Sequence, residues 1–249
     1  MSYKIAIAGK GGTGKTTLAA LIIRELLARN KTPILAVDAD PNSNLNEALG
    51  VEYDSMIADI REEIPQKQLP VNVTKSDYIN KRLQEAIAEF KGFDLLVMGR
   101  PEGPGCYCYV NELLRQHLSK LGNQYKFVVM DNEAGMEHLS RRTTDDIDLL
   151  IVTSDQTLVG IRSAGRVVQV LKSLKLKIKK KFLVINRAKP ALTAAQNTAL
   201  EETGLELLGV IPEDETINSY REQGRNLLDS SASSKAVSAL SDLIQKAGV

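Results

Sequence analysis

A glycine-rich loop near the start of the chain carries the residues with the clearest chemistry. Residues 9–17 read G-K-G-G-T-G-K-T-T and satisfy the pattern G-x-x-x-x-G-K-[ST] between an apolar run and a helical pattern. Glycines let successive backbone N–H groups point at one anion, and the following helix adds its dipole and free N–H groups. Lys15 is expected to reach the β- and γ-phosphates of a nucleotide, and the Thr16 hydroxyl to complete a Mg²⁺ shell. A glycine-rich turn with a chance lysine is the alternative. The predicted phosphate-binding residues are Gly9, Lys10, Gly11, Gly12, Thr13, Gly14, Lys15, Thr16 and Thr17.

Acidic side chains follow two of the apolar runs. Asp38 and Asp40 come directly after the run 32–37, and Asp131 ends the run 125–131. The carboxyl ends of parallel strands form the edge at which open α/β sheets bind ligands, so these carboxylates are expected beside the glycine-rich loop. Asp131 is then expected to bind Mg²⁺ through water. Helix capping is the alternative explanation for the pair Asp38 and Asp40.

The only two cysteines stand in one tripeptide, Cys106-Tyr107-Cys108. A disulfide across one residue would be strained, but two thiolates fill half of a tetrahedral S₄ site. Two chains around a two-fold axis would supply four sulfurs for Zn²⁺, Ni²⁺ or a cluster. Two small residues packed at a helix start are the alternative. His138 could serve as a metal ligand or sensor, but a histidine in the first turns of a helix is more often an ordinary surface residue.

Apolar runs alternate with helical patterns along the chain. This alternation predicts one α/β domain over residues 1–249, with a doubly wound, mostly parallel sheet of about seven strands and helices on both faces. Residues 76–91 show helical spacing, the basic run 172–181 is interpreted as a solvated helix end and turn, and residues 230–234 as a flexible stretch. The predicted strands cover 5–8, 32–37, 93–98, 125–131, 148–153, 181–185 and 207–211, and the main helices 18–27, 110–121, 158–174 and 235–246.

Composition narrows the classes of partner. The chain has 249 residues and a formal charge of +1, which gives no overall field for nucleic acid or for an anionic membrane. No apolar stretch approaches the ~20 residues that span a bilayer, and no signal-peptide pattern precedes the first strand. We therefore expect a soluble, cytoplasmic protein that binds neither nucleic acid nor membrane, with its cysteines kept as thiols.

Lys10, directly after the first glycine, narrows the type of loop. With it the loop resembles the deviant Walker A loop of the MinD/ParA/nitrogenase-iron-protein class of dimeric ATPases. The resemblance implies that Lys10 crosses the dimer interface to the partner's nucleotide, that Asp40 orients the attacking water and that Asp38 holds the Mg²⁺ shell through water. It also implies adenine contacts from Asn186-Arg187 and from the loop Pro212-Glu213. A solvated lysine is the alternative for Lys10.

The order of the motifs narrows the resemblance further. G-K-G-G-T-G-K-T-T, D-A-D-P, C-Y-C and D-x-x-A-G-x-E-H-L together resemble the CooC-type ATPases, which insert nickel into carbon monoxide dehydrogenase and, in a sister branch, acetyl-CoA synthase. This implies a P-loop ATPase with ATP/ADP and Mg²⁺, catalytic Lys10, Lys15 and Asp40, and a homodimer that holds Zn²⁺ or Ni²⁺ at Cys106 and Cys108 for a nickel-enzyme client. Asn132-Glu133 replaces the Met-Gly of the carbon monoxide dehydrogenase members, which leaves the client open. The alternatives are an iron-sulfur electron donor like the nitrogenase iron protein and a MinD/ParA-like positioning ATPase, which leaves the cysteines unexplained.

Overall fold

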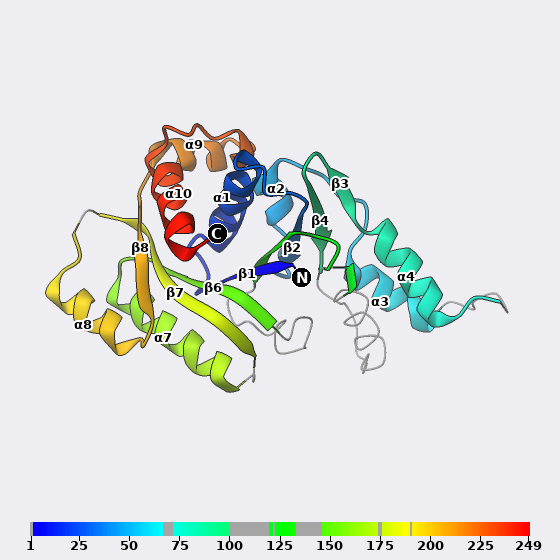
Figure 1. Ribbon diagram of the computed structural model, residues 1–249, viewed down its shortest axis with the longest axis horizontal. Helices are drawn as coiled ribbons and strands as arrows, with labels where there is room; N and C mark the ends of the chain where they lie inside the picture. Colours follow the sequence, from blue (N-terminus) through cyan, green and yellow to red (C-terminus); the bar gives the residue numbers. More distant parts are fainter. Residues whose placement is uncertain are drawn as a thin grey trace.

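One eight-stranded sheet organises the chain (Figure 1). The computed structural model describes residues 2–66, 72–99, 120–121, 123–132, 146–173, 176–189 and 191–249. The strands are β1 Tyr3–Ala8, β2 Ile34–Ala39, β3 Ala88–Phe90, β4 Phe93–Val97, β5 Phe127–Asn132, β6 Asp146–Ser154, β7 Lys177–Ala188 and β8 Glu206–Pro212. The helices are α1 Lys15–Ala28, α2 Leu45–Leu49, α3 Ile57–Gln66, α4 Lys75–Glu85, α7 Leu158–Ser173, α8 Ala194–Glu202, α9 Glu215–Glu222 and α10 Lys235–Ala247, with a 3-10 turn η1 at Leu227–Asp229.

The strand order is β3-β4-β2-β5-β1-β6-β7-β8, and every neighbouring pair is parallel except β3–β4. The doubly wound, mostly parallel sheet is thus confirmed, with eight strands where about seven are predicted. The additional strand is β3, which the sequence reading assigns to the end of a helix over 76–91. Helix α4 ends at Glu85 instead, and Phe90 stacks on Phe93 with ring centroids 5.3 Å apart across the β3–β4 turn. This aromatic pair favours a hairpin at the edge of the sheet.

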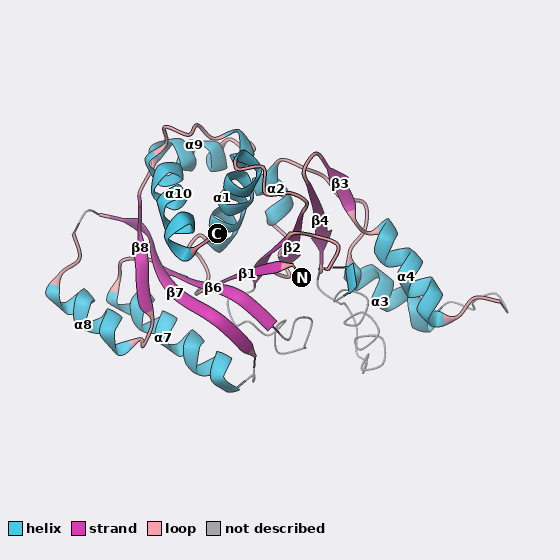
Figure 2. Cartoon of the chain, viewed as in Figure 1, coloured by secondary structure: helices cyan, strands magenta, loops and turns pink. Residues whose placement is uncertain are grey.

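Helices cover both faces of the sheet (Figure 2), because its central strands are apolar on both sides. Ile5 and Ile7 of β1 belong to the core that includes α1, α2, α9 and α10. Ala6 and Ala8 face the core that includes α3, α4, α7 and α8. Within the described ranges, no helix is long and apolar enough to cross a membrane.

The basic run 172–181 is a correction to the sequence reading. Helix α7 ends at Ser173, and β7 begins at Lys177, so most of the lysines lie in an extended strand and not in a turn. Lys179 forms an ion pair with Asp148 at 2.6 Å, and Lys180 donates to the backbone carbonyl of Ala247 at 2.9 Å. Strand pairing with β6 therefore outweighs the turn expected from charge density.

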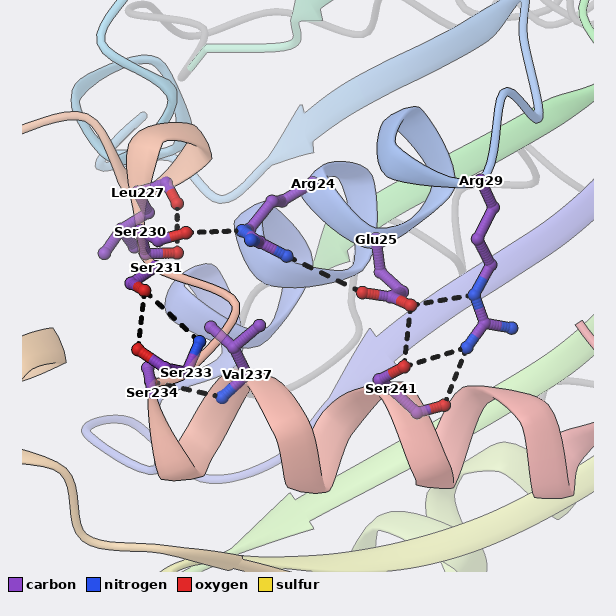
Figure 3. Close-up of polar contacts among 10 residues, drawn as sticks. All are labelled: Arg24, Glu25, Arg29, Leu227, Ser230, Ser231, Ser233, Ser234, Val237 and Ser241. Carbon is purple, nitrogen blue, oxygen red and sulfur yellow. Dashed lines mark hydrogen bonds and ion pairs between the residues drawn. The ribbon is translucent and has the colours of Figure 1, made fainter.

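The serine-rich stretch 230–234 is also more ordered than predicted. Ser230 and Ser234 are buried, at 2% and 6% exposure. The Ser230 hydroxyl donates to the carbonyl of Leu227, and the Ser234 hydroxyl accepts from the backbone N–H of Val237 and thereby caps α10 (Figure 3). Serine composition suggests flexibility, but these hydroxyls satisfy backbone groups that a helix end leaves unpaired.

Candidate functional site

The glycine-rich loop joins β1 to α1 in a conformation that requires glycine at two positions. Gly9 has φ 149°, and a Cβ there would lie 2.2 Å from the carbonyl oxygen of Thr153. Gly14 has φ 88° and precedes α1 without any side-chain cap, and a Cβ there would lie 2.3 Å from Nδ2 of Asn186. The loop can therefore pass close to β6 and β7, and the first N–H groups of α1 stay available for an anion.

Neighbouring strands hold the loop in place. The carbonyl of Thr13 accepts from Nδ2 of Asn186 at 2.9 Å and from Oγ1 of Thr153 at 3.4 Å. The guanidinium of Arg187 donates to the carbonyl of Gly12. The backbone φ of Arg187 is 52°, which is unusual for a residue other than glycine. Asn186, predicted to contact adenine, thus also fixes the phosphate loop, and Thr153 is a loop-positioning residue that no sequence motif marked.

The two lysines of the loop have different environments. Lys15 is buried, at 7% exposure, at the start of α1. It lies close enough to Asp131 for its positive charge to lower the pKa of that carboxyl group. Lys10 is exposed, and in the part of the chain that the structure describes its side chain forms no ion pair or hydrogen bond. Its backbone carbonyl accepts from the N–H and hydroxyl of Thr13, which folds the loop locally. A free cation at this position is what a residue reserved for a second chain would show, and also what a solvated lysine would show.

Asp131 is the most unusual carboxylate of the described residues. It is 1% exposed at the carboxyl end of β5, and neither oxygen has a hydrogen-bond partner among the described residues. Burial raises its pKa to about 6, against the opposing effects of the nearby Thr16 hydroxyl and Lys15 ammonium. An orphaned acceptor of this kind beside a threonine hydroxyl and a phosphate loop has the oxygen donor set that Mg²⁺ prefers. Thr16 and Asp131 therefore fit the predicted magnesium shell.

Asp38 lies next to Asp131 in the pairing of β2 with β5. It is fully buried, and burial, with further contributions from Asp131 and Asp40, raises its pKa to about 7. Its oxygens accept from the N–H groups of Asp40 at 3.1 Å and of Leu45 at 2.9 Å, the first residue of α2. The capping alternative thus describes what Asp38 does in this structure. A role for Asp38 toward Mg²⁺ through water stays a prediction.

Asp40 sits in the turn after β2. Its Oδ1 accepts from the N–H and the side-chain amide of Asn42, at 2.9 and 3.0 Å, and its carbonyl accepts from the N–H of Ser43. These bonds form a local turn that positions the carboxylate at the edge of the site. Whether Asp40 orients the attacking water stays a prediction.

A cleft beside the loop is lined by α1, α9 and α10. The empty space in and in front of it, including the part that is continuous with solvent, is about 430 Å³. Asn186, Arg187 and Pro212 line it, and their contacts with a nucleotide base stay a prediction, whereas Glu213 is exposed and does not line it. Sequence reasoning missed the contributions of α9 and α10. The lining residues are Gly14, Thr17, Leu18, Leu21, Asn186, Arg187, Ile211, Pro212, Asp214, Ile217, Asn218, Arg221 and Ala236.

Several predicted features lie outside the described residues, namely Cys106, Cys108, His138, the helix over most of 110–121 and the segment after Asn132. Asn132 itself is described and 1% exposed. Its amide donates to the carbonyl of Ile7 at 3.0 Å, which ties the end of β5 to the strand that precedes the phosphate loop.

Residues 4–227 match the family of the CobQ/CobB/MinD/ParA nucleotide binding domain. The chain belongs to this family. It is therefore an ATP-hydrolysing P-loop enzyme that uses ATP and Mg²⁺, which agrees with the loop geometry and with the orphaned carboxylate of Asp131.

Individual relatives extend the comparison. The chain is 44% identical to the uncharacterized ATP-binding protein MJ0685 of Methanocaldococcus jannaschii, over 88% of each chain. It is 28% identical to the carbon monoxide dehydrogenase accessory protein CooC of Rhodospirillum rubrum, over 98% of this chain and 97% of that one. In structure it resembles the septum site-determining protein MinD of Pyrococcus horikoshii complexed with Mg-ADP, with a TM-score of 0.70, 23% identity and coverage of 98% and 94%. This last likeness shows the fold.

Proposed function

We propose that this ATPase is a metallochaperone that dimerises with ATP and metal and assists nickel insertion into carbon monoxide dehydrogenase or acetyl-CoA synthase. Two findings support the proposal: the order of the motifs along the chain, and the similarity to CooC over nearly the whole length of both proteins. In this proposal Cys106 and Cys108 of two chains together bind one Zn²⁺ or Ni²⁺ ion.

One contact among the described residues carries the proposed coupling, because it joins Asp38 to Met98, the residue after β4, from which the chain continues toward the cysteines in the sequence. The N–H of Met98 donates to the backbone carbonyl of Asp38 at 2.8 Å. The carbonyl of Met98 in turn accepts from Ala58 at the start of α3, at 3.0 Å. In this proposal, a change at Asp38 and Asp40 when the γ-phosphate binds or leaves would be passed to Met98 through this bond.

The chemistry assigned to the site follows from its charges. Lys15 would bind the β- and γ-phosphates, and Thr16 with Asp131 would hold Mg²⁺, which neutralises charge on the phosphate oxygens when bound. Asp40 would orient the attacking water. Lys10 of one protomer would place its positive charge near the nucleotide of the other, where negative charge accumulates during phosphoryl transfer.

A positioning ATPase of the MinD kind is the second candidate, favoured by the likeness to MinD over nearly the whole chain. Positioning ATPases act on a membrane or on DNA. In this chain the apolar stripe of α10 is buried: Val237, Leu240 and Ile244 are at most 4% exposed and pack in the core with α1. Helix α10 therefore has no apolar face available for a membrane in this structure.

Metal analysis of single cysteine variants tests the proposal. Purified Cys106→Ser and Cys108→Ser should each lose zinc or nickel measured by inductively coupled plasma analysis, while their ATP affinity stays unchanged. Tyr107→Phe, within the same tripeptide, is the matched control and should keep its metal. Metal retained in both serine variants would exclude the cysteines from the mechanism, and a visible cluster absorption band in the wild type would favour the iron-sulfur alternative.

A further inference from the structure

The cleft beside the phosphate loop is assembled from helices that are distant in the sequence. Thr17, Leu18 and Leu21 come from α1, Ile217, Asn218 and Arg221 from α9, and Ala236 from α10. Its width therefore depends on how α9 and α10 are held relative to each other and to α1.

Asp214 joins two of these three helices. Its Oδ1 accepts from the N–H of Thr216 at 2.8 Å and so caps α9. Its Oδ2 accepts from the hydroxyl of Ser234 at 2.7 Å and from the N–H of Ala236 at 3.0 Å, at the start of α10. One carboxylate at 9% exposure thus organises two helix N-termini, where a negative charge is also favoured by both helix dipoles.

The charge of Asp214 is stable in this position. Burial alone would raise its pKa, but the hydrogen bonds from Ala236, Ser234 and Thr216 outweigh burial and lower the pKa to about 2. The carboxylate therefore stays ionised at any pH at which the protein is handled.

A second polar cluster fixes α10 to α1 (Figure 3). Glu25 of α1 accepts from Ser241 of α10 at 2.8 Å and from Arg29 at 2.7 Å, and Arg29 also donates to the carbonyl of Ser241 at 2.9 Å. Arg24 donates to the carbonyl of Ser230 at 2.9 Å. With α10 held to α1, Asp214 is a direct polar connection between α9 and α10, beside the apolar packing of Ile217 in the shared core.

We propose that Asp214 is a positioning residue for the nucleotide base, which sets the cleft between α1, α9 and α10 by capping α9 and α10 together. The inference rests on the assignment of this cleft to the base and is independent of the proposed metal transfer. Asp214 acts through Asn218, Arg221 and Ala236, which line the same cleft, and not on the phosphates, which belong to the loop at residues 9–17.

Asp214→Asn is the decisive variant. With the amide oxygen still facing Thr216, the amide nitrogen would face the Ala236 N–H, which loses its acceptor, and the Ser234 hydroxyl, which would have to turn from donating to accepting. We expect the affinity for Mg·ATP, measured by calorimetric titration, to fall roughly tenfold or more. The affinity for Mg·tripolyphosphate, which has phosphates but no base, should stay within about twofold, and kcat at saturating ATP should be unchanged while KM rises.

Two further variants keep the test falsifiable. Ser234→Ala removes one of the three donors and should weaken ATP binding by a smaller factor, again without an effect on tripolyphosphate. Asp242→Asn, on the exposed side of α10, is the matched control and should bind both ligands as the wild type does. Equal losses for ATP and tripolyphosphate would show that Asp214 merely supports the fold. Unchanged ATP binding in both Asp214→Asn and Ser234→Ala, or equal wild-type affinity for the two ligands, would overturn the inference.

Discussion

Two buried carboxylates, Asp131 at the nucleotide site and Glu25 on α1, have opposite surroundings. Asp131 is 1% exposed and, within the described part of the chain, neither oxygen accepts a hydrogen bond. Glu25 is 7% exposed, accepts from Arg29 and Ser241, and forms an ion pair with Arg24 at 3.6 Å. Both are desolvated, but the Thr16 hydroxyl and the Lys15 ammonium offset only part of the burial of Asp131, whereas Glu25 accepts direct hydrogen bonds that replace the lost water.

The difference indicates that Glu25 stabilises the fold, whereas Asp131 belongs to the nucleotide site. The network around Glu25 is complete in the folded chain and fastens α10 to α1 (Figure 3). We expect the site around Asp131 and Lys15 to be complete only when a nucleotide and Mg²⁺ supply the missing charges. Such a site lowers the stability of the nucleotide-free protein in order to bind its ligand, a pattern common at functional sites.

The largest expected effects on ATP binding and hydrolysis come from Lys15 and Asp40. Lys15→Ala should abolish nucleotide binding, because no other buried cation at the loop can replace it among the described residues. Asp40→Ala should still bind ATP, but its rate of ATP hydrolysis should fall by roughly a hundredfold or more, the usual effect of removing a group that orients the attacking water. Calorimetric titration and a phosphate-release assay on both variants would separate the two roles. Full activity of Asp40→Ala would remove the water-orienting assignment.

Lys10 extends the comparison to the second chain. Lys10→Ala should leave the affinity for ADP almost unchanged and, if the lysine binds the partner's phosphates as proposed, should remove ATP-dependent dimerisation. Light scattering with a non-hydrolysable ATP analogue measures this. Lys75→Ala, an exposed lysine at the start of α4, is a suitable control. If Lys10→Ala still dimerises with the ATP analogue, Lys10 is an ordinary solvated lysine and has no role at the dimer interface.

Replacing either carboxylate by the amide of the same shape should change the free energy of unfolding, but in opposite directions at the two sites. At pH 8 and without nucleotide, Asp131→Asn should raise the free energy of unfolding by roughly 1–3 kcal/mol, since it removes a buried charge that Thr16 and Lys15 compensate only in part. Glu25→Gln should lower it by a similar amount, since it weakens the bonds from Arg24 and Arg29. Urea denaturation of the two variants beside the wild type is the measurement. Destabilisation by both substitutions would contradict the contrast drawn between the two sites.

The pH dependence of stability gives a smaller, graded effect. The pKa values of Asp131 and Asp38 are raised to about 6 and about 7, so between pH 4 and 7 the folded protein holds more protons than the unfolded chain. The nucleotide-free protein should therefore lose stability as pH rises through this window, by up to roughly 1.4 kcal/mol per pH unit for each group. Asp214, with its pKa lowered to about 2, has the opposite sign: its contribution is present above pH 4 and is lost as the pH falls toward 2. In thermal melts, Asp131→Asn should flatten the decline between pH 4 and 6, and an unchanged slope would argue against the raised pKa.

The sequence predicted the parts of the fold and site that depend on local pattern. The phosphate loop, the buried parallel strands and the acids that follow them are each encoded in a few consecutive residues. The parts it missed depend on tertiary contacts. Thr153 and Asp214 act through backbone groups far away in the chain, which no spacing rule indicates. The hairpin at Ala88–Phe90 and the extended β7 arise from pairing with neighbouring strands, which outweighed helical spacing and charge density.

The central claim, a metal site shared between two ATP-bound chains, is tested most directly by the metal content of the purified dimer. Each chain offers only two cysteines, so four thiolates require two chains. Inductively coupled plasma analysis across a size-exclusion peak, with a non-hydrolysable ATP analogue present, should find one zinc or nickel ion per two chains, and the metal should promote dimer formation. One tightly bound metal ion per monomer, eluting at the monomer position, would contradict the account.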